Sequence, residues 1–356
     1  MAPQDIANLR LINQQIAFHP SKNPEQVVTA LGAIQAQDYN GALWAIGLRL
    51  TNSKKTDIEK SIRDRKIIRT WPMRGTLHFI PAIDAKWMLK LMASRILANA
   101  SSRERNLGLN DKVFENGRKT VVKILEKNKC MTNNEIIQAL EKSNISTEGY
   151  RGRHILWHLA QEGTVCFGPH DEKQPTFVLM DEWVPKQRNI EHGDALTEIA
   201  KRFFASHGPA TLQDFIRWTG LKSSDARKGL ENVRKFTKSE TINKVEYIMS
   251  KDSKKIKIMQ KAYLLPGFDE YMLGYKNRED MLHPLHSNKI VPGGNGMFLP
   301  TIVIDGRVVG IWKKEVKKNG IIINLQPFNK LTKEQIEYIA IAKEQYSRFL
   351  GIPLID

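Results

Sequence analysis

Apolar residues recur at helical spacing along most of the first two thirds of the chain. Residues 5–18 carry apolar side chains three or four positions apart, which predicts a helix that Pro20 ends. Asn23 and Pro24 predict the start of a second helix, whose apolar face runs to Ile34. Two further helices are predicted at 40–50 and around 58–62.

A pair of β-prone segments follows these helices. Residues 67–70 and 76–80 are rich in β-branched and aromatic side chains, and residues 72–75 between them contain the proline and glycine typical of a hairpin turn. Helices followed by a hairpin predict a winged helix.

The same order of helices and hairpin recurs twice. Thr132 and Glu135 form a capping-box pattern at one helix start, and Ser223 is the predicted cap of another. The second round has helices predicted at 81–100, 111–127, 132–142 and 150–161 and strands at 164–167 and 176–179. The third has helices at 194–206, 211–218 and 223–233 and strands at 234–238 and 245–249.

The pattern changes at about residue 251, after a basic run. Asp305 and Gly306 give a strong hairpin signal, and residues 333–349 predict a last helix. Short strands are predicted at 262–265, 302–304, 307–312 and 320–326. The predicted fold is therefore mainly α with β (α+β), with three tandem winged-helix motifs and a small β-barrel-like domain. The predicted boundaries are 1–81, 82–190, 191–250 and 251–356.

The charge balance points to a polyanionic partner. The 356 residues include 55 Lys and Arg against 38 Asp and Glu, a net charge of +17, which favours binding to double-stranded DNA. Cys130 and Cys166 are too few for a disulfide framework and indicate a reducing compartment. No run of eighteen apolar residues or signal pattern occurs, so we expect a cytoplasmic protein that does not bind membranes.

Two glutamines, Gln35 and Gln37, stand at the end of the second predicted helix with Ala36 between them. If the segment is helical, their side chains lie about 200° apart, whereas in an extended segment they share one face. An extended pair would place two neutral amides side by side, able to hold a water molecule or a sugar-phosphate. The alternative is a helix end with two exposed glutamines.

Several motifs, taken together, resemble the winged-helix DNA glycosylases of the AlkZ-like group, bacterial enzymes that remove bulky alkylated bases and unhook interstrand crosslinks. The resemblance covers nearly the whole chain. Its motifs are Leu31–Asp38, Arg74–His78, Gly208–Thr211, Trp218–Leu221, Leu264–Tyr275, Asn295–Thr301 and Asp305–Gly310. It implies a C-shaped array of three winged helices and a catalytic glutamine pair, which falls on Gln35 and Gln37. A sister group has Asp at the second position.

The chemistry of such a reaction suits neutral amides. A purine alkylated in its five-membered ring is positively charged and leaves readily, so the enzyme mainly has to place a water molecule at the sugar carbon. A glutamine oxygen can accept a hydrogen bond from that water. Asp38 is either the carboxylate of the site or the N-cap of the helix starting at Asn40.

Further candidate residues lie on the predicted hairpins and loops. We expect Arg69 and Arg74 on the first hairpin to contact DNA, and His78 either supports catalysis or is a strand residue with one hydrogen bond. Arg151 and Arg153 precede a predicted helix and are candidate phosphate ligands, the alternative being a solvated helix start. Asn295, in a glycine-rich loop, is a further candidate DNA contact, and Asp269–Tyr271 are interpreted as structural.

No metal and no cofactor are expected. His154 and His158 have a known zinc spacing, but Leu156, Trp157 and Leu159 indicate packing. The predicted protein is a monomeric DNA repair glycosylase acting on alkylated purines. The alternatives are a winged-helix regulator, which has no need of the two glutamines, and a resistance protein that sequesters a genotoxin.

Overall fold

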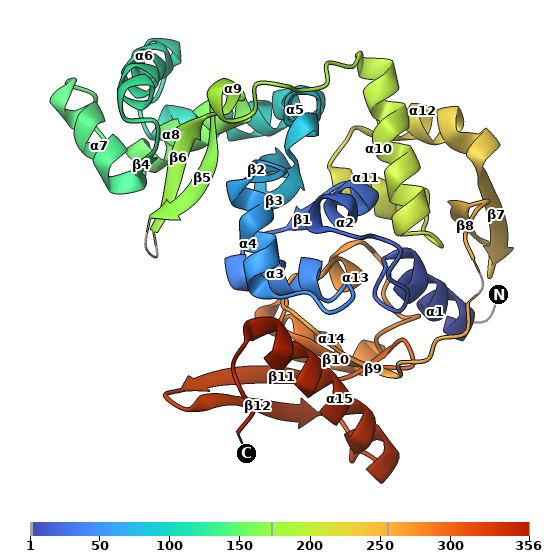
Figure 1. Ribbon diagram of the computed structural model, residues 1–356. Coiled ribbons are helices and arrows are strands. Elements are labelled where there is room, and N and C mark those ends of the chain that lie inside the picture. Colours follow the sequence, from blue (N-terminus) through green and yellow to red (C-terminus); the bar gives the residue numbers. More distant parts are fainter. Residues whose placement is uncertain (1–2, 172–173, 255, 356) are drawn as a thin grey trace. The chain divides into compact units, whose positions relative to one another are not determined.

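The computed structural model describes residues 3–171, 174–254 and 256–355 (Figure 1). The chain forms two compact units. Unit 1 consists of Met1–Lys60, Leu196–Trp218 and Lys222–Asp356, and unit 2 of Ser61–Ala195 and Thr219–Leu221. The boundaries between the units fall within α4, α10 and α11.

Unit 1 begins with short helices whose ends differ from the predicted ones. The first helix ends at Asn13 instead of residue 18, because Gln15 takes a left-handed backbone conformation with φ 60°. Asn23 caps the second helix through its side chain, with Pro24 in the first turn as predicted. The elements are α1 (Pro3–Asn13), α2 (Pro24–Leu31), β1 (Ile34–Gln35), α3 (Tyr39–Gly47) and α4 (Lys55–Arg63).

The middle segment of unit 1 carries a two-stranded antiparallel hairpin. Its first strand starts at Thr237, three residues after the predicted start, because Arg234–Phe236 form a 3₁₀ turn. The predicted cap Ser223 is wrong: Lys222 holds the N-cap position, without a side-chain capping bond, and Ser223 is the first helical residue. The elements are α10 (His192–Ser206), α11 (Leu212–Thr219), α12 (Ser223–Val233), β7 (Thr237–Ile242) and β8 (Val245–Ser250).

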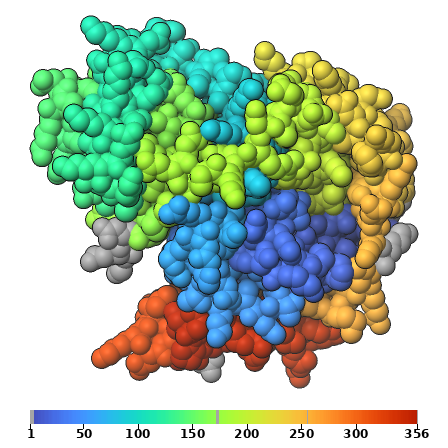
Figure 2. Space-filling model, turned by 45° about the horizontal axis from the view of Figure 1, so that its top comes forward, coloured from blue at the N-terminus to red at the C-terminus, as the bar shows by residue number. Residues whose placement is uncertain are grey.

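The C-terminal part of unit 1 is a four-stranded antiparallel sheet in the order β12-β11-β10-β9. Asp305 and Gly306 form the predicted tight turn, both with positive φ. The rings of Trp44 on α3 and Trp312 on β11 each lie 5.0 Å from the ring of Tyr346 on the last helix. The elements are β9 (Ala262–Leu265), α13 (Glu270–Leu273), η3 (Pro284–His286), α14 (Ser287–Ile290), η4 (Pro292–Gly294), β10 (Thr301–Ile304), β11 (Arg307–Lys317), β12 (Gly320–Pro327) and α15 (Lys333–Leu350). Figure 2 shows the N-terminal helices (blue) packed against this C-terminal segment (red).

Unit 2 contains antiparallel strands in the order β3-β2-β5-β6-β4, with helices packed on them. Thr132 and Glu135 form the predicted capping box. The elements are β2 (Ile67–Met73), β3 (Thr76–Pro81), η1 (Ala82–Asp84), α5 (Ala85–Asn106), α6 (Asp111–Asn128), β4 (Met131–Thr132), α7 (Asn133–Lys142), α8 (Arg151–Gln161), β5 (Val165–Asp171), β6 (Gln174–Leu179) and α9 (Met180–Trp183). The core of this unit lies between α6, α7, α8 and the strands, around residues such as Val121, Ile136, Ile155, Leu159 and Phe177.

The fold is thus a mixture of helices and antiparallel strands, as the sequence predicts. Three hairpins follow groups of helices, close to the predicted places. The winged-helix motifs, the barrel and the domain boundaries stay predictions. In the part of the chain that the structure describes, none of the helices combines the length and the apolar character needed to cross a membrane.

Candidate functional site

The segment that carries Gln35 and Gln37 is extended at Gln35 and bends at Gln37. The helix α2 ends at Leu31 because Gly32 turns the chain with φ 84°, so the segment leaves the helix three residues before the predicted end at Ile34. Gln35 belongs to the two-residue strand β1 and is 8% exposed, whereas Gln37 lies in a bend and is exposed. The helical conformation considered from sequence is not found, and the extended one holds at Gln35. That both side chains line one polar pocket stays a prediction.

A buried carboxylate holds the backbone of this segment. The main-chain N–H of Gln35 donates to Oε1 of Glu270 over 2.9 Å, and the indole N–H of Trp218 donates to Oε2 over 2.9 Å. Beside it, Arg49 and Asp269 form a bidentate ion pair with both distances 2.9 Å and both side chains fully buried. These contacts all lie within unit 1 and fix the segment from inside the protein.

Asp38 directly precedes α3, which starts at Tyr39, one residue before the predicted start. It occupies the N-cap position with an extended backbone, as predicted, but its side chain makes no capping hydrogen bond. A Cβ atom placed on Gly41 would lie 2.6 Å from Asp38 Oδ2, so the carboxylate lies over the first turn of the helix. The negative charge there is favoured by the helix dipole.

The first hairpin of unit 2 ends in a two-residue turn, Arg74–Gly75. Both residues have positive φ, 54° and 67°, and Met73 pairs with Thr76 across them, which is the geometry of a tight hairpin turn. His78 is fully buried; its Nδ1 lies 2.8 Å from the carbonyl oxygen of Thr76, and its Nε2 lies 3.3 Å from Nη2 of Arg74.

These two contacts fit one tautomer of His78. A guanidinium can only donate, so Nε2 of His78 accepts from Arg74 and Nδ1–H donates to the carbonyl oxygen of Thr76. His78 is thus a buried strand residue with two contacts, where the sequence-based alternative gave it one, and its support of catalysis stays a prediction.

Arg69 lies near the start of strand β2, five residues before Arg74 and in the middle of the sheet. It pairs with Phe79 on one side and with Phe167 on the other, and its guanidinium lies 4.9 Å from the centroid of the Phe167 ring. A cation over an aromatic face contributes about 0.5–1 kcal/mol at an exposed site. Arg69 is half-buried, and its predicted contact with DNA stays a prediction.

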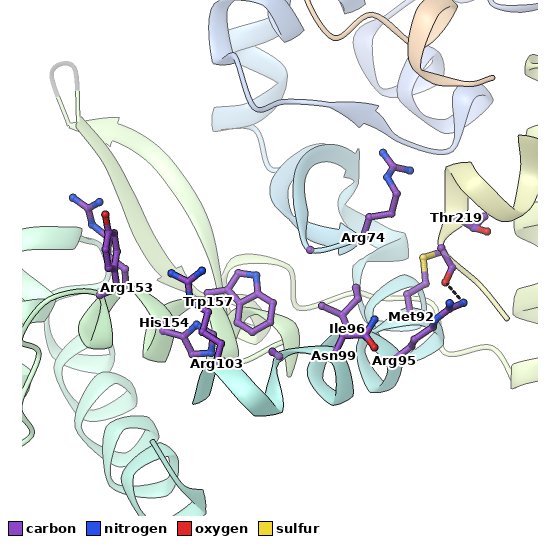
Figure 3. A pocket seen from close by; sticks show the side chains of 14 residues that line it. Arg74, Met92, Arg95, Ile96, Asn99, Arg103, Arg153, His154, Trp157 and Thr219 are labelled. Atoms are coloured by element: carbon purple, nitrogen blue, oxygen red, sulfur yellow. Dashed lines mark hydrogen bonds between the residues drawn. The ribbon is translucent and has the colours of Figure 1, made fainter. Parts of the chain in front are cut away.

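A groove of about 610 Å³ lies within unit 2, between α5, α8 and the Arg74–Gly75 turn (Figure 3). Figure 3 shows Met92, Ile96 and Asn99 of α5 lying side by side along it, with Trp157 of α8 farther along. The lining residues are Arg74, Gly75, Met92, Arg95, Ile96, Asn99, Ala100, Arg103, Tyr150, Arg153, His154, Trp157, Thr219 and Gly220. Four of these described residues are arginines and none is acidic. The groove therefore suits a ligand with negative charge and a flat apolar part.

The two arginines of α8 have different surroundings. Arg151 donates from Nε to the carbonyl oxygen of Ser146 over 3.0 Å and from Nη1 to that of Leu107. It joins two loops and does not line the groove. Arg153, by contrast, is exposed and lines the groove, as does Arg103, whose guanidinium lies 5.7 Å from the ring centroid of Tyr150. Both arginines were predicted as candidate phosphate ligands, but only Arg153 lines the groove.

His154 and His158 meet the carboxylate of Glu104 behind the groove, with Nε2 of His154 at 3.2 Å and Nδ1 of His158 at 3.0 Å from the same oxygen. Burial lowers the pKa of His154. For His158 burial acts in the same direction, but hydrogen bonds to Glu162 and Glu104 outweigh it and raise the pKa. Among the described residues, no three His, Cys, Asp or Glu side chains are arranged to hold a metal ion.

Asn295 lies in the glycine-rich loop of unit 1, where Gly293, Gly294 and Gly296 all have positive φ. Its side-chain oxygen accepts the main-chain N–H of Met297 over 2.9 Å, which closes a local turn. The residue is exposed, and its contact with DNA stays a prediction.

Sequence reasoning missed several residues of these sites. Arg95 and Arg103 both lie on α5, which continues to Asn106, beyond the predicted helix end at residue 100. Only the packing of α5 against α8 brings them beside Trp157. Trp157 was assigned to packing with Leu156 and Leu159; the two leucines are buried, but Trp157 is half-exposed in the groove. The arginine spacing on 85–106 was an available signal, since charges on one helix face line a common surface.

Comparisons with known proteins point in one direction. Residues 28–349 match the family described as "DNA glycosylase AlkZ-like". The chain is 26% identical over 324 residues to an interstrand DNA cross-link repair glycosylase of Streptomyces sahachiroi, covering 85% of each protein. Its fold is similar to the solved structure of the Streptomyces sahachiroi DNA glycosylase AlkZ, with a TM-score of 0.81, 23% identity and coverage of 99% of this chain and 98% of the other.

Proposed function

Since the chain belongs to the AlkZ-like family of DNA glycosylases, enzymes that hydrolyse N-glycosidic bonds, we propose that it excises alkylated, positively charged purines from duplex DNA. In this proposal Gln35 and Gln37 place the attacking water. The observation that carries it is the extended backbone at Gln35, because an extended segment allows alternate side chains to share one face.

The reaction needs little acid catalysis. The bond between the sugar carbon and the purine nitrogen breaks, and its electron pair neutralises the charged base, which leaves as a neutral molecule. The sugar becomes positively charged, as in glycoside hydrolysis, and water adds to it while its proton passes to solvent. The carbonyl oxygens of Gln35 and Gln37 orient the water by accepting its hydrogen bonds.

Neutral amides also set the substrate class. A glutamine cannot stabilise the positively charged sugar as strongly as a carboxylate does, so an unmodified nucleoside should be cut slowly. A purine that already carries a positive charge needs less help. Asp38 lies one residue from Gln37 and, being exposed, is the candidate carboxylate to support the water if the two amides are not sufficient.

DNA binding in this proposal uses the arginines of the groove in unit 2. Arg74, Arg103 and Arg153 contact phosphates, and Trp157 provides a flat apolar surface beside them. The groove's charge and the net charge of +17 support a phosphate-dominated interface. Arg69 and Asn295 are secondary contacts, and we propose that one chain acts alone on DNA.

Other parts of the proposal come from the family. Three winged helices would occupy 1–81, 82–190 and 191–250, and a β-barrel-like domain 251–356. The relative of Streptomyces sahachiroi is named for interstrand cross-link repair, and 26% identity over 85% of both chains supports the same reaction here. For a crosslink that joins two alkylated purines, unhooking is the same bond cleavage on a larger leaving group.

The test is base release from defined DNA. The purified protein is incubated with a duplex that carries one N7-methylguanine, and abasic sites are measured by strand cleavage after hot alkali. We expect abasic sites and no cleavage before the alkali step, because water and not an amine attacks the sugar. Normal binding to the duplex without any abasic site would instead favour a non-catalytic DNA-binding protein.

A further inference from the structure

The carboxylate of Glu270 lies directly behind the strand that carries Gln35. Glu270 is the first residue of α13 and is fully buried. One of its oxygens accepts the main-chain N–H of Gln35 and the other accepts the indole N–H of Trp218, both over 2.9 Å. Each oxygen thus accepts from a different donor in a segment far away in the sequence, and Nε2 of the buried His207 lies 3.6 Å from Oε2.

Trp218 also contacts the same segment by packing. A Cβ atom placed on Gly32 would lie 3.3 Å from Cη2 of Trp218, which shows how closely the indole approaches the turn before β1. The turn at Gly32 and the amide at Gln35 are therefore both held, one by the indole ring and one by the carboxylate that the indole binds. Between these two points the chain has little freedom to shift.

The backbone of Glu270 is itself fixed by a separate ion pair. Asp269 caps α13 by accepting the N–H of Tyr271 over 2.9 Å, and both its oxygens bind Arg49. Folding of this region is thus secured by Asp269 and Arg49. The neighbouring carboxylate of Glu270 binds Gln35 and Trp218 instead and takes no part in that ion pair.

We propose that Glu270 is a positioning residue for the reaction, which sets the orientation of Gln35 by binding its main-chain amide. This proposal rests on the proposed function of Gln35 and Gln37. A water molecule has to be placed within a fraction of an ångström of its reactive position, and a displacement of about 1 Å costs roughly a hundredfold in rate. A strand of two residues has too few ladder bonds to hold that position alone.

The chemistry of the two donors explains why a carboxylate is needed. An ionised glutamate offers acceptor sites on both oxygens, whereas glutamine offers one acceptor oxygen and one donor NH₂ group. In Glu270→Gln, one of the two N–H donors must therefore face the NH₂ group. Removing the indole donor with Trp218→Phe should relieve this conflict, because the new amide oxygen is then free for Gln35.

The two changes give a test by double-mutant cycle. Single-turnover excision of N7-methylguanine from a duplex, DNA affinity and thermal midpoint are measured for wild type, Glu270→Gln, Trp218→Phe and the double variant. We expect Glu270→Gln to lose about ten- to a hundredfold in rate with DNA affinity unchanged. The double variant should recover to near the rate of Trp218→Phe.

Tyr271→Phe is the matched control. Tyr271 lies on the same short helix as Glu270. Its hydroxyl donates to the carbonyl oxygen of Gly306 over 2.8 Å, and this bond does not involve Gln35. The control should lower the thermal midpoint without lowering the rate of excision. A loss of rate in Tyr271→Phe as large as in Glu270→Gln would show that the rate follows stability and would overturn the proposal.

The cycle itself gives the main contradicting outcome: a double variant as slow as Glu270→Gln, or slower. If Glu270→Gln alone does not fold, the double variant is compared with Trp218→Phe, and a rate at least tenfold lower contradicts the proposal. Gln37→Ala is measured alongside. If Gln37→Ala loses excision and the cycle shows no recovery, only the positioning role fails; if Gln37→Ala is fully active, the proposed function of the glutamines fails.

Discussion

At the scale of residues, backbone conformation decides which chemistry two glutamines can share. The positive φ of Gly32 ends α2 early and leaves Gln35 in an extended segment. A continued helix would direct Gln35 and Gln37 to nearly opposite sides. The turn at Gly32 thus removes the helical arrangement, which would keep the two side chains apart, and a shared water molecule stays part of the proposal.

The sequence indicated this residue pair but not its buried partner. Gln35 and Glu270 are 235 positions apart, and no local pattern links them. The motif Asp269–Tyr271 was interpreted as structural, which fits Asp269 and its ion pair with Arg49. The contact of Glu270 with Gln35 depends on how α13 packs against β1, a long-range feature that periodicity does not carry.

Arg74 provides a prediction at this scale. Arg74→Ala should weaken duplex binding across sequences and make the salt dependence shallower by about one charge, if the guanidinium meets a phosphate. Ala and Arg both have a Cβ atom, so the left-handed turn is equally strained in both. The measurement is the slope of the logarithm of affinity against that of salt concentration. Lys142→Ala, an exposed change on α7, is the control, and an unaltered slope in Arg74→Ala would mean that the residue is only part of the turn.

At the scale of elements, local signals predicted several turns and helix starts, although the predicted cap at Ser223 was wrong. The Asp305–Gly306 turn, the Asn23 cap and the Thr132 capping box each depend on a few adjacent residues, and each was found. Helix ends were less predictable. The first helix ends at Asn13 and not at 18, because a left-handed residue interrupts an apolar pattern that continues beyond it.

A second prediction concerns the two arginines of α8, which differ in their contacts. Arg153→Ala should lower DNA affinity and the salt slope, because the side chain is exposed in the groove. Arg151→Ala should instead lower the thermal midpoint and leave the slope unchanged, because it loses main-chain contacts at Ser146 and Leu107. Salt titration and thermal unfolding of both variants distinguish the roles. Equal slopes for Arg151→Ala and Arg153→Ala would contradict this division.

At the scale of the whole molecule, sequence predicted the type of fold and the polyanionic partner from periodicity and charge. The sequence pattern could not predict the groove of unit 2. The helices α5 and α8 are about fifty residues apart, and only their packing brings Arg103, Tyr150 and Trp157 together. Charge counts report a partner's sign, but not the place where it binds.

Stability against pH is a third prediction, through His207. Its pKa is lowered from the ordinary 6.5 mainly by burial, against the opposing effect of Glu270. Below about pH 6.5 His207 takes up a proton in the unfolded chain but stays neutral in the folded one. Its contribution to the free energy of unfolding therefore falls as the pH falls. The stability difference between wild type and His207→Phe should be greatest above about pH 7 and shrink at lower pH. Denaturant unfolding of both proteins across this pH range measures the difference in free energy of unfolding. A difference that does not change with pH would contradict the role of His207 in the pH dependence.

The most direct measurement is the single-turnover rate at which Gln37→Ala releases N7-methylguanine from a duplex, together with its affinity for the same duplex. We expect a loss of about ten- to a thousandfold in rate with affinity largely kept, because only an interaction in the transition state is removed. The double variant Gln35→Ala, Gln37→Ala should be at least as slow. Full activity in the double variant would contradict the proposed role of the two glutamines, and Asp38 would then be the next side chain to replace.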